Sequence, residues 1–281
     1  MQPQIITLTT DFGSMDTYVA QMKGAIVGIN PAARIIDVTH GIPPQDLFRG
    51  ALALDEIVDC FPDGTVHVAV VDPGVGSQRR IIAVELGQQR FVLPDNGLIE
   101  RVRQRLPIRQ IVEVTEATFF RRSFVQSEAS ESEATPISNT FHGRDIMAPV
   151  AAHLSLGVEF EELGPTVRED SLCELAIPDP IVTDHSIIGH VVWTDSFGNL
   201  ITNIDAGLIP SDQFSNLQIS IGLTEIIGIR HTYSDVAAGQ IMALINSSGR
   251  LEIAVNGGRA CEFVGRDSNS ADVRVTFSTI V

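Results

Sequence analysis

Short apolar runs alternate with amphipathic segments in the first half of the chain. β-branched apolar runs predict strands, and apolar residues three or four positions apart predict helices. The expected strands are 5–10, 33–38, 66–71, 81–85, 90–93 and 108–114. The expected helices are centred on Val19–Ile29 (with Asp16 as N-cap), Leu47–Val58 and Ile146–Leu154, with a short one leading to Arg105. This alternation predicts an α/β domain whose mostly parallel sheet is covered on both faces.

The pattern changes after Gly164-Pro165. Residues 166–185 are acidic, proline-containing and weakly periodic, which is typical of a linker. Only short strands follow, expected at 187–194, 200–204, 217–221, 226–232, 241–245, 251–255 and 273–278, with a hairpin turn at 246–249. We therefore expect an α/β domain over 1–168, a linker over 169–184 and an all-β barrel domain over 185–281.

Composition narrows the function classes. The net charge of −16 over 281 residues argues against a nucleic-acid or anionic-membrane surface, which would need clustered Lys and Arg. No apolar run approaches the roughly 20 residues of a membrane helix, and the N-terminus has no signal-peptide pattern. Residues 126–139 are polar and acidic without periodicity, and we expect a mobile surface loop there.

The cysteines indicate the compartment. Cys60, Cys173 and Cys261 are widely spaced, which speaks against a disulfide framework or a thiolate zinc site. We expect a cytoplasmic protein.

Two carboxylates stand where a ligand site is expected. Asp11 and Asp72 each follow a buried strand, and ligands of open α/β sheets bind beyond the carboxyl ends of the strands. The two could act as acid and base or bind a metal, or one could bind a diol while the other does chemistry. Metal binding is less favoured because no His/Asp/Glu group has ligand spacing. A structural alternative exists: Asp72-Pro73-Gly74 as a plain tight turn with solvated arginines.

Other candidate motifs also have structural alternatives. His142 alone is more often a hydrogen-bonding structural residue than a catalyst. Residues 195–199 could be a strand-ending turn with Phe197 in the core, and residues 256–258 a glycine-rich hairpin. Their combination is more specific than any one of them. In chain order the motifs are Thr10-Asp11-Phe12-Gly13 with Asp16, Val71-Asp72-Pro73-Gly74-Val75-Gly76 with Arg79, Pro94-Asp95-Asn96-Gly97, Phe141-His142-Gly143-Arg144-Asp145, Asp195-Ser196-Phe197-Gly198-Asn199 with Thr202-Asn203, and Asn246-Ser247 with Asn256-Gly257-Gly258.

This set resembles the S-adenosyl-L-methionine (SAM) hydroxide adenosyltransferase family, or SAM hydrolases, which are related to the SAM-dependent fluorinase and chlorinase. The resemblance implies a homotrimer of two-domain subunits. It places the site between the first domain of one subunit and the barrel of its neighbour. SAM is then the substrate, and neither a cofactor nor a metal is expected.

The resemblance also implies residue roles. Asp72, Arg79 and His142 would orient and activate the water that attacks ribose C5′, which releases adenosine and L-methionine. Substrate contacts would come from Asp11 (ribose hydroxyls), from Asp16, Asp195 and Ser247 (the methionine end), from Phe197, Asn199 and the backbone around Val255 and Gly257 (adenine), and from Tyr233 (over the nucleoside).

Two positions favour hydrolysis over halogenation. Asp72 replaces an uncharged residue of the halogenating relatives, and Gly143 replaces the serine that donates to halide in the fluorinase. Ile201 and Ser248 stand where halogenases have a tryptophan and an arginine at the ligand. The alternatives are a SAM-dependent halogenase, a non-catalytic SAM or adenosine sensor, and a metal-dependent hydrolase built on Asp11, Asp72 and His142.

Overall fold

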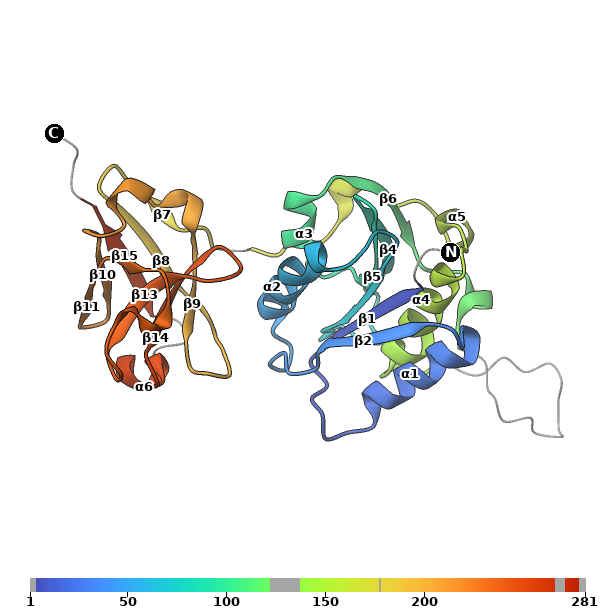
Figure 1. Ribbon diagram of the computed structural model, residues 1–281. Coiled ribbons are helices and arrows are strands. Elements are labelled where there is room, and N and C mark those ends of the chain that lie inside the picture. The colour runs from blue at the N-terminus through green and yellow to red at the C-terminus, as the bar shows by residue number, and fades with distance from the viewer. Residues whose placement is uncertain (1–3, 122–136, 177, 266–270, 278–281) are drawn as a thin grey trace. The chain divides into compact units, whose positions relative to one another are not determined.

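The computed structural model describes residues 4–121, 137–176, 178–265 and 271–277. The chain divides into two compact units, unit 1 (Met1–Ala176) and unit 2 (Ile177–Val281), which are described separately (Figure 1). Unit 1 is a helix-covered α/β sheet and unit 2 is a barrel-like all-β structure, so the predicted fold class is confirmed.

Unit 1 is built on a six-stranded sheet. Its strands, in spatial order, are β2 (Arg34–Thr39), β1 (Ile5–Thr10), β3 (Val66–Val70), β5 (Gln89–Pro94), β4 (Ile81–Leu86) and β6 (Ile108–Glu113). The pairs β2–β1, β1–β3 and β3–β5 are parallel. Strand β4 is antiparallel to β5, because the tight turn at Gly87-Gln88 joins the two directly, and it is antiparallel to β6 as well. Because β1 and β3 are parallel neighbours, Asp11 and Asp72, which follow them, lie at the same edge of the sheet.

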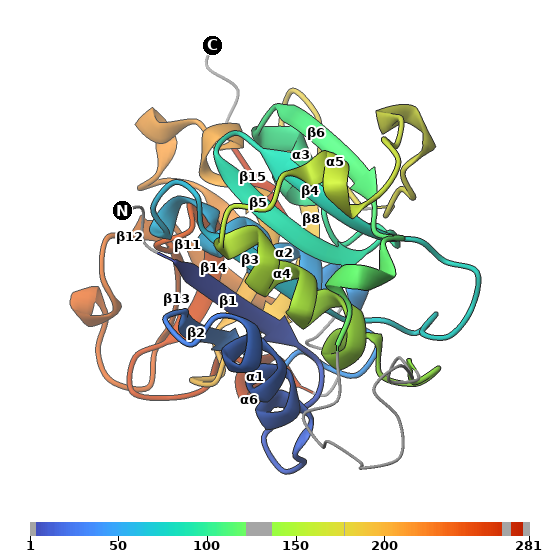
Figure 2. The ribbon, with the colours of Figure 1, turned by 90° about the vertical axis from the view of Figure 1, so that its right-hand side faces the viewer.

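Helices cover both faces of this sheet, as predicted (Figure 2). Helices α1 (Tyr18–Ile29) and α4 (Ala148–Ser155) pack on one face, and α2 (Leu47–Ile57) and α3 (Glu100–Arg105) on the other. The shorter helices are η1 (Val58–Cys60), η2 (Ala117–Phe119), the π-helix η3 (Gly143–Met147), α5 (Phe160–Leu163) and η4 (Glu169–Ser171). Within the described ranges, no helix combines the length and apolar character needed to cross a membrane.

Two local expectations need correction. The N-cap residue of α1 is Thr17, not Asp16, and no side chain caps this end. Asp16 is exposed one residue earlier. Most of the predicted 126–139 loop, residues 126–136, lies outside the described residues. Its end is anchored rather than loose: Ile137 packs against the core of unit 1, and Ser138 N–H donates to Asp145.

Unit 2 is one curled sheet of short strands around an apolar core. In spatial order the strands are β11 (Thr224–Ile227), β10 (Gln218–Ile221), β15 (Asp272–Thr276), β8 (Ser186–Thr194), β9 (Leu200–Asp205), β14 (Arg250–Val255), β13 (Ile241–Ile245) and β12 (Ile229–Arg230), with β7 (Ile181–Val182) pairing to β8. Strand β11 approaches β13, which nearly closes the barrel. The short helices are η5 (Ala206–Leu208), η6 (Ser211–Gln213), η7 (Tyr233–Asp235) and α6 (Ala260–Val264).

The predicted strand 226–232 is wrong as one element. Gly228 has a φ of 74° and divides it into β11, which pairs with β10, and β12, which pairs with β13. A left-handed residue turns the backbone out of the extended conformation, and glycine adopts it without steric cost.

Candidate functional site

Asp72, Arg79 and His142 lie together in unit 1. Asp72 follows β3, Arg79 lies in the loop before β4, and His142 immediately precedes η3. Arg79 Nε donates to both carboxylate oxygens of Asp72, at 2.9 and 3.0 Å, and Nη2 donates to Oδ2. The same Nη2 lies 2.9 Å from His142 Nδ1. The structure therefore brings these three side chains together around one guanidinium, and their catalytic role stays a prediction.

Two glycines permit this close approach. Gly76 has a φ of 77°, and a Cβ there would lie 2.2 Å from the carbonyl oxygen of Asn139. The backbone of the loop that carries Arg79 therefore packs directly against the segment that leads to His142. A Cβ on Gly143 would lie 3.3 Å from Val70 Cγ1 and 3.5 Å from Met22 Sδ, so the start of η3 packs against β3 and α1. π-helical turns are frequent at functional sites.

His142 is held in its neutral form with a defined tautomer. Burial lowers the pKa of His142, the charge of Arg79 lowers it further, and the carboxylates of Asp72 and Asp145 oppose these effects. A guanidinium has only donors, so His142 Nδ1 must accept from Arg79. The proton of the neutral ring is therefore assigned to Nε2. In this arrangement His142 can donate a hydrogen bond from Nε2 but cannot take a proton there.

Asp11 is fixed by a contact that sequence reasoning missed. Its Oδ2 accepts from the backbone N–H of Gln45 at 2.8 Å, and its own N–H donates to Val70 at 3.4 Å. Gln45 has a φ of 65°, the only positive value among non-glycine residues of the described chain. Nothing in the sequence around Gln45 signals this conformation. The contact orients the carboxylate at the end of β1.

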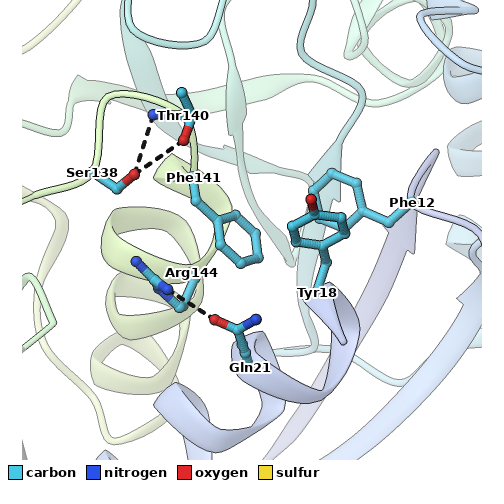
Figure 3. A pocket seen from close by; sticks show the side chains of 7 residues that line it. All are labelled: Phe12, Tyr18, Gln21, Ser138, Thr140, Phe141 and Arg144. Carbon is cyan, nitrogen blue, oxygen red and sulfur yellow. Dashed lines mark hydrogen bonds between the residues drawn. The ribbon is translucent and has the colours of Figure 1, made fainter. Parts of the chain in front are cut away.

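Unit 1 also contains a pocket of about 340 Å³ (Figure 3). Its lining includes Phe12 and Phe141, the chain neighbours of Asp11 and His142. Phe12, Tyr18 and Phe141 place their ring centroids 5.2–5.7 Å apart in tilted and edge-to-face contacts. Arg144 lies 4.9 Å above the Phe141 ring and donates to Gln21 and to Asp145. Asp145 is shared between Arg144 and Arg121, and the three aromatic rings of the lining suit a flat or apolar group.

In unit 2, Asp195 and Asn199 form one hydrogen-bonded turn. Asp195 accepts from the Asn199 backbone N–H at 2.8 Å and from its amide at 3.0 Å. Phe197, between them, is 74% exposed, so its alternative placement in the core is wrong. An exposed aromatic ring beside a fixed carboxylate is available for a ligand.

Tyr233 donates to a buried carboxylate that the sequence reading did not single out. Its hydroxyl lies 2.9 Å from Glu252 Oε1, and Glu252 is only 3% exposed. Burial, the Glu252 hydrogen bond and the negative charges of Glu252 and Asp195 raise the pKa of Tyr233 to about 12. Burial and the Asp195 charge also raise the pKa of Glu252. Tyr233 and Glu252 are therefore in direct contact, and the charge of Asp195 acts on both.

The remaining candidates of unit 2 lie at strand ends. Ser247 is exposed in the turn between β13 and β14. Val255 ends β14 with its side chain buried in the barrel core, so only its backbone could reach a ligand. Gly257 follows in an exposed turn with a φ of 68°. Across the part of the chain that the structure describes, no group of three or more His, Cys, Asp or Glu side chains could hold a metal ion.

Comparison with family models gives two matches in chain order. Residues 6–164 match the SAM hydroxide adenosyltransferase N-terminal domain, and residues 189–271 match the C-terminal domain. These ranges include every candidate site residue named above.

Individual relatives agree with the family models. A protein of Salinispora tropica named (R)-S-adenosyl-L-methionine hydrolase is 38% identical over 92% of this chain and 93% of its own, and one of the same name from Thermus thermophilus is 38% identical over 91% and 93%. A fluorinase of an Actinoplanes species is 28% identical over 90% and 91%. The crystal structure of an uncharacterized conserved protein from Thermotoga maritima matches with a TM-score of 0.85 and 33% identity, over 97% of this chain and 100% of that one. The chain belongs to the SAM hydroxide adenosyltransferase family.

Proposed function

We propose that this protein hydrolyses SAM to adenosine and L-methionine by attack of water at ribose C5′. The observation that carries the proposal is the contact of one guanidinium, that of Arg79, with both the Asp72 carboxylate and the His142 imidazole. Relatives of 35–38% identity are named as SAM hydrolases, whereas the matching fluorinases are 24–28% identical. Hydrolysis is therefore favoured over halogenation.

The reaction needs a positioned nucleophile more than an acid. The water oxygen forms a bond to C5′ while the C5′–S bond breaks, and the electron pair of the breaking bond stays on sulfur. The positively charged sulfonium becomes the neutral thioether of methionine, so the leaving group needs neither a proton nor a Lewis acid. Holding the water in line with the C5′–S bond can lower the activation free energy by several kcal/mol through orientation alone. EDTA is accordingly expected to leave the rate unchanged.

The three residues take different parts in this proposal. Neutral His142, with its proton on Nε2, donates a hydrogen bond to the water oxygen and fixes its direction. Asp72 is then the basic group of the three, and it receives the proton that the attacking water loses. Arg79 holds both partners in place, and its charge stabilises the negative charge that develops on oxygen.

Substrate binding is assigned by the family resemblance. Asp11 takes the ribose hydroxyls, because one carboxylate can accept from both. Asp16, Asp195 and Ser247 receive the methionine end. Phe197, Asn199 and the backbone at Val255 and Gly257 receive adenine, and Tyr233 covers the nucleoside. The exposure of Phe197 and its fixed neighbour Asp195 support this assignment.

Assembly and location complete the proposal. We propose a homotrimer, which light scattering should detect as about three times the mass of one chain. A monomer that is fully active would contradict a site shared between subunits. The three unpaired cysteines support a cytoplasmic location.

Isotope labelling tests the reaction. The protein is incubated with SAM in ¹⁸O-water, with and without chloride, beside a sample without protein. Mass spectrometry should find one ¹⁸O in the 5′-hydroxyl of adenosine and unlabelled methionine. Unchanged SAM would overturn the proposal in favour of a sensor, and chloride-dependent 5′-chloroadenosine would overturn it in favour of a halogenase.

A further inference from the structure

Glu252 is an unusual residue for the outside of a barrel wall. It lies in β14, where Leu251, Ile253 and Val255 point into the core of unit 2. By strand alternation Glu252 points the other way, where a carboxylate would normally be solvated. It is nevertheless 3% exposed. Burying a carboxylate is costly unless hydrogen bonds compensate, so the residues that hydrogen-bond Glu252 need to be identified.

Tyr233 and Asn246 are the side chains that hydrogen-bond Glu252. The phenol hydroxyl donates to Glu252 Oε1 at 2.9 Å, while 47% of the tyrosine remains exposed. The polar end of the side chain is therefore anchored and part of its surface is left open.

The backbone of Tyr233 is fixed as well. The preceding residue, Thr232, caps η7 in a reciprocal capping box with Asp235. Beyond η7, Val236 packs on the outer apolar cluster of Met242, Leu244 and Ala254, and its carbonyl accepts from the Asn256 amide at 2.8 Å. Backbone and hydroxyl together prevent the ring from turning away.

A second carboxylate lies near this pair. Asp195 directly follows Thr194, which pairs with Leu200 of β9, and Leu200 pairs in turn with Ile253, the neighbour of Glu252 in β14. The charge of Asp195 acts on both Tyr233 and Glu252, and Asn199 holds Asp195 in place. An aromatic face fixed in advance beside an anionic group suits a flat heterocycle that carries a positive charge nearby.

We propose that Glu252 is a positioning residue, which holds the Tyr233 ring as a preformed stacking face for the adenosyl group beside Asp195. The inference rests on the proposed function for the identity of the ligand. It adds a residue to which the family resemblance gives no role. Glu252 acts through Tyr233 and does not touch the reacting atoms.

Variants of both partners test the hydrogen bond. Glu252→Met removes the acceptor at similar size, Glu252→Gln keeps one, and Tyr233→Phe removes the donor. We expect Glu252→Met and Tyr233→Phe each to raise KM for SAM about five- to tenfold, with kcat changed less than twofold. The double variant should be no worse than either single one, and Glu252→Gln should recover most of the affinity. Glu225→Gln, on the exposed side of β11, is the matched control.

A merely structural role predicts different results. Glu252→Met would then lower the melting temperature and the active fraction without changing KM, and Glu252→Gln would not restore binding. If Glu252→Met fails to fold, Tyr233→Phe still decides, because an unchanged KM in that variant overturns the inference. Calorimetric titration with adenosine repeats the comparison without turnover. The two proposals can fail separately. If the wild-type protein leaves SAM intact but these variants bind adenosine more weakly than the wild type, the proposed function fails and the inference about Glu252 is supported.

Discussion

At the scale of single residues, one cation connects the two groups proposed to handle water. Arg79 contributes two hydrogen atoms on Nη2, one toward Asp72 and one toward His142. The side chains of Asp72 and Arg79 are 4% and 10% exposed, so solvent screens their ion pair poorly. The arrangement fixes the tautomer of His142, and in the proposed mechanism Asp72 is therefore the proton acceptor.

Removing the charge of Asp72 tests that division of roles. Asp72→Asn keeps the size of the side chain but cannot accept the proton, and kcat should fall about 10²- to 10⁴-fold. SAM affinity, measured by calorimetry, should change much less. Asp184→Asn, which changes an exposed carboxylate between β7 and β8, is the control. Unaltered turnover in Asp72→Asn would remove Asp72 from the mechanism.

The pH dependence tests the neutral state of His142. Protonation puts a hydrogen on Nδ1, which then faces the Arg79 donor, so activity should be lost as the pH falls. Because burial and Arg79 lower the pKa of His142, kcat/KM should fall only below pH 6.5. His142→Asn, which can still accept from Arg79, should be less active and should lack this acidic limb. A limb centred above pH 6.5 in the wild type would contradict the assignment.

At the scale of elements, the site depends on how closely two segments approach. The loop between β3 and β4 carries Asp72 and Arg79, and the segment before η3 carries His142. Gly76 is the point at which they press together. The sequence predicts the strand ends and the bare backbone there, since both are local patterns. The contact with Asn139 follows from tertiary packing, so it has no local signal.

A methyl group at this point should separate the two segments. Gly76→Ala places a Cβ on the Asn139 carbonyl and in a left-handed conformation, and should cost about 1–3 kcal/mol of stability. Turnover should fall at least tenfold because Arg79 moves from His142. Gly24→Ala, in an open position of α1, should fold and turn over like the wild type or be slightly more stable. Melting curves and steady-state rates measure both effects, and wild-type values for Gly76→Ala would show that the contact is dispensable.

At the scale of the whole molecule, sequence periodicity predicts the α/β and all-β parts because burial imposes different periods on helices and strands. Sequence periodicity fails where contacts between residues distant in the sequence determine the local structure. The antiparallel β4, the division of 226–232 at Gly228 and the capping of α1 all depend on neighbours distant in sequence or on backbone angles. Glu252 and Gln45 were missed for the same reason: each is defined by a partner, Tyr233 or Asp11, rather than by a motif.

Global stability should depend on pH through His67. This fully buried ring on β3 contacts Thr7 and stacks on Phe91, and burial lowers its pKa to about 4. Between pH 6.5 and 4 the unfolded chain binds a proton there that the folded protein does not, so acidification favours unfolding. The stability lost over this window is about 3 kcal/mol. Urea unfolding at several pH values should show a steeper decline for the wild type than for His67→Gln, and parallel curves would contradict the prediction.

The left-handed backbone of Gln45 has opposite effects on the stability of the fold and on the orientation of Asp11. A non-glycine residue with a φ of 65° costs the fold energy, of order 1 kcal/mol or more. The same conformation aims an N–H at Asp11. Glycine there would relieve this cost and raise the thermal stability, but it would hold the N–H less firmly toward Asp11, the residue proposed to bind the ribose hydroxyls. Selection for a hardier protein and selection for a tighter substrate complex should therefore choose different amino acids at this one position.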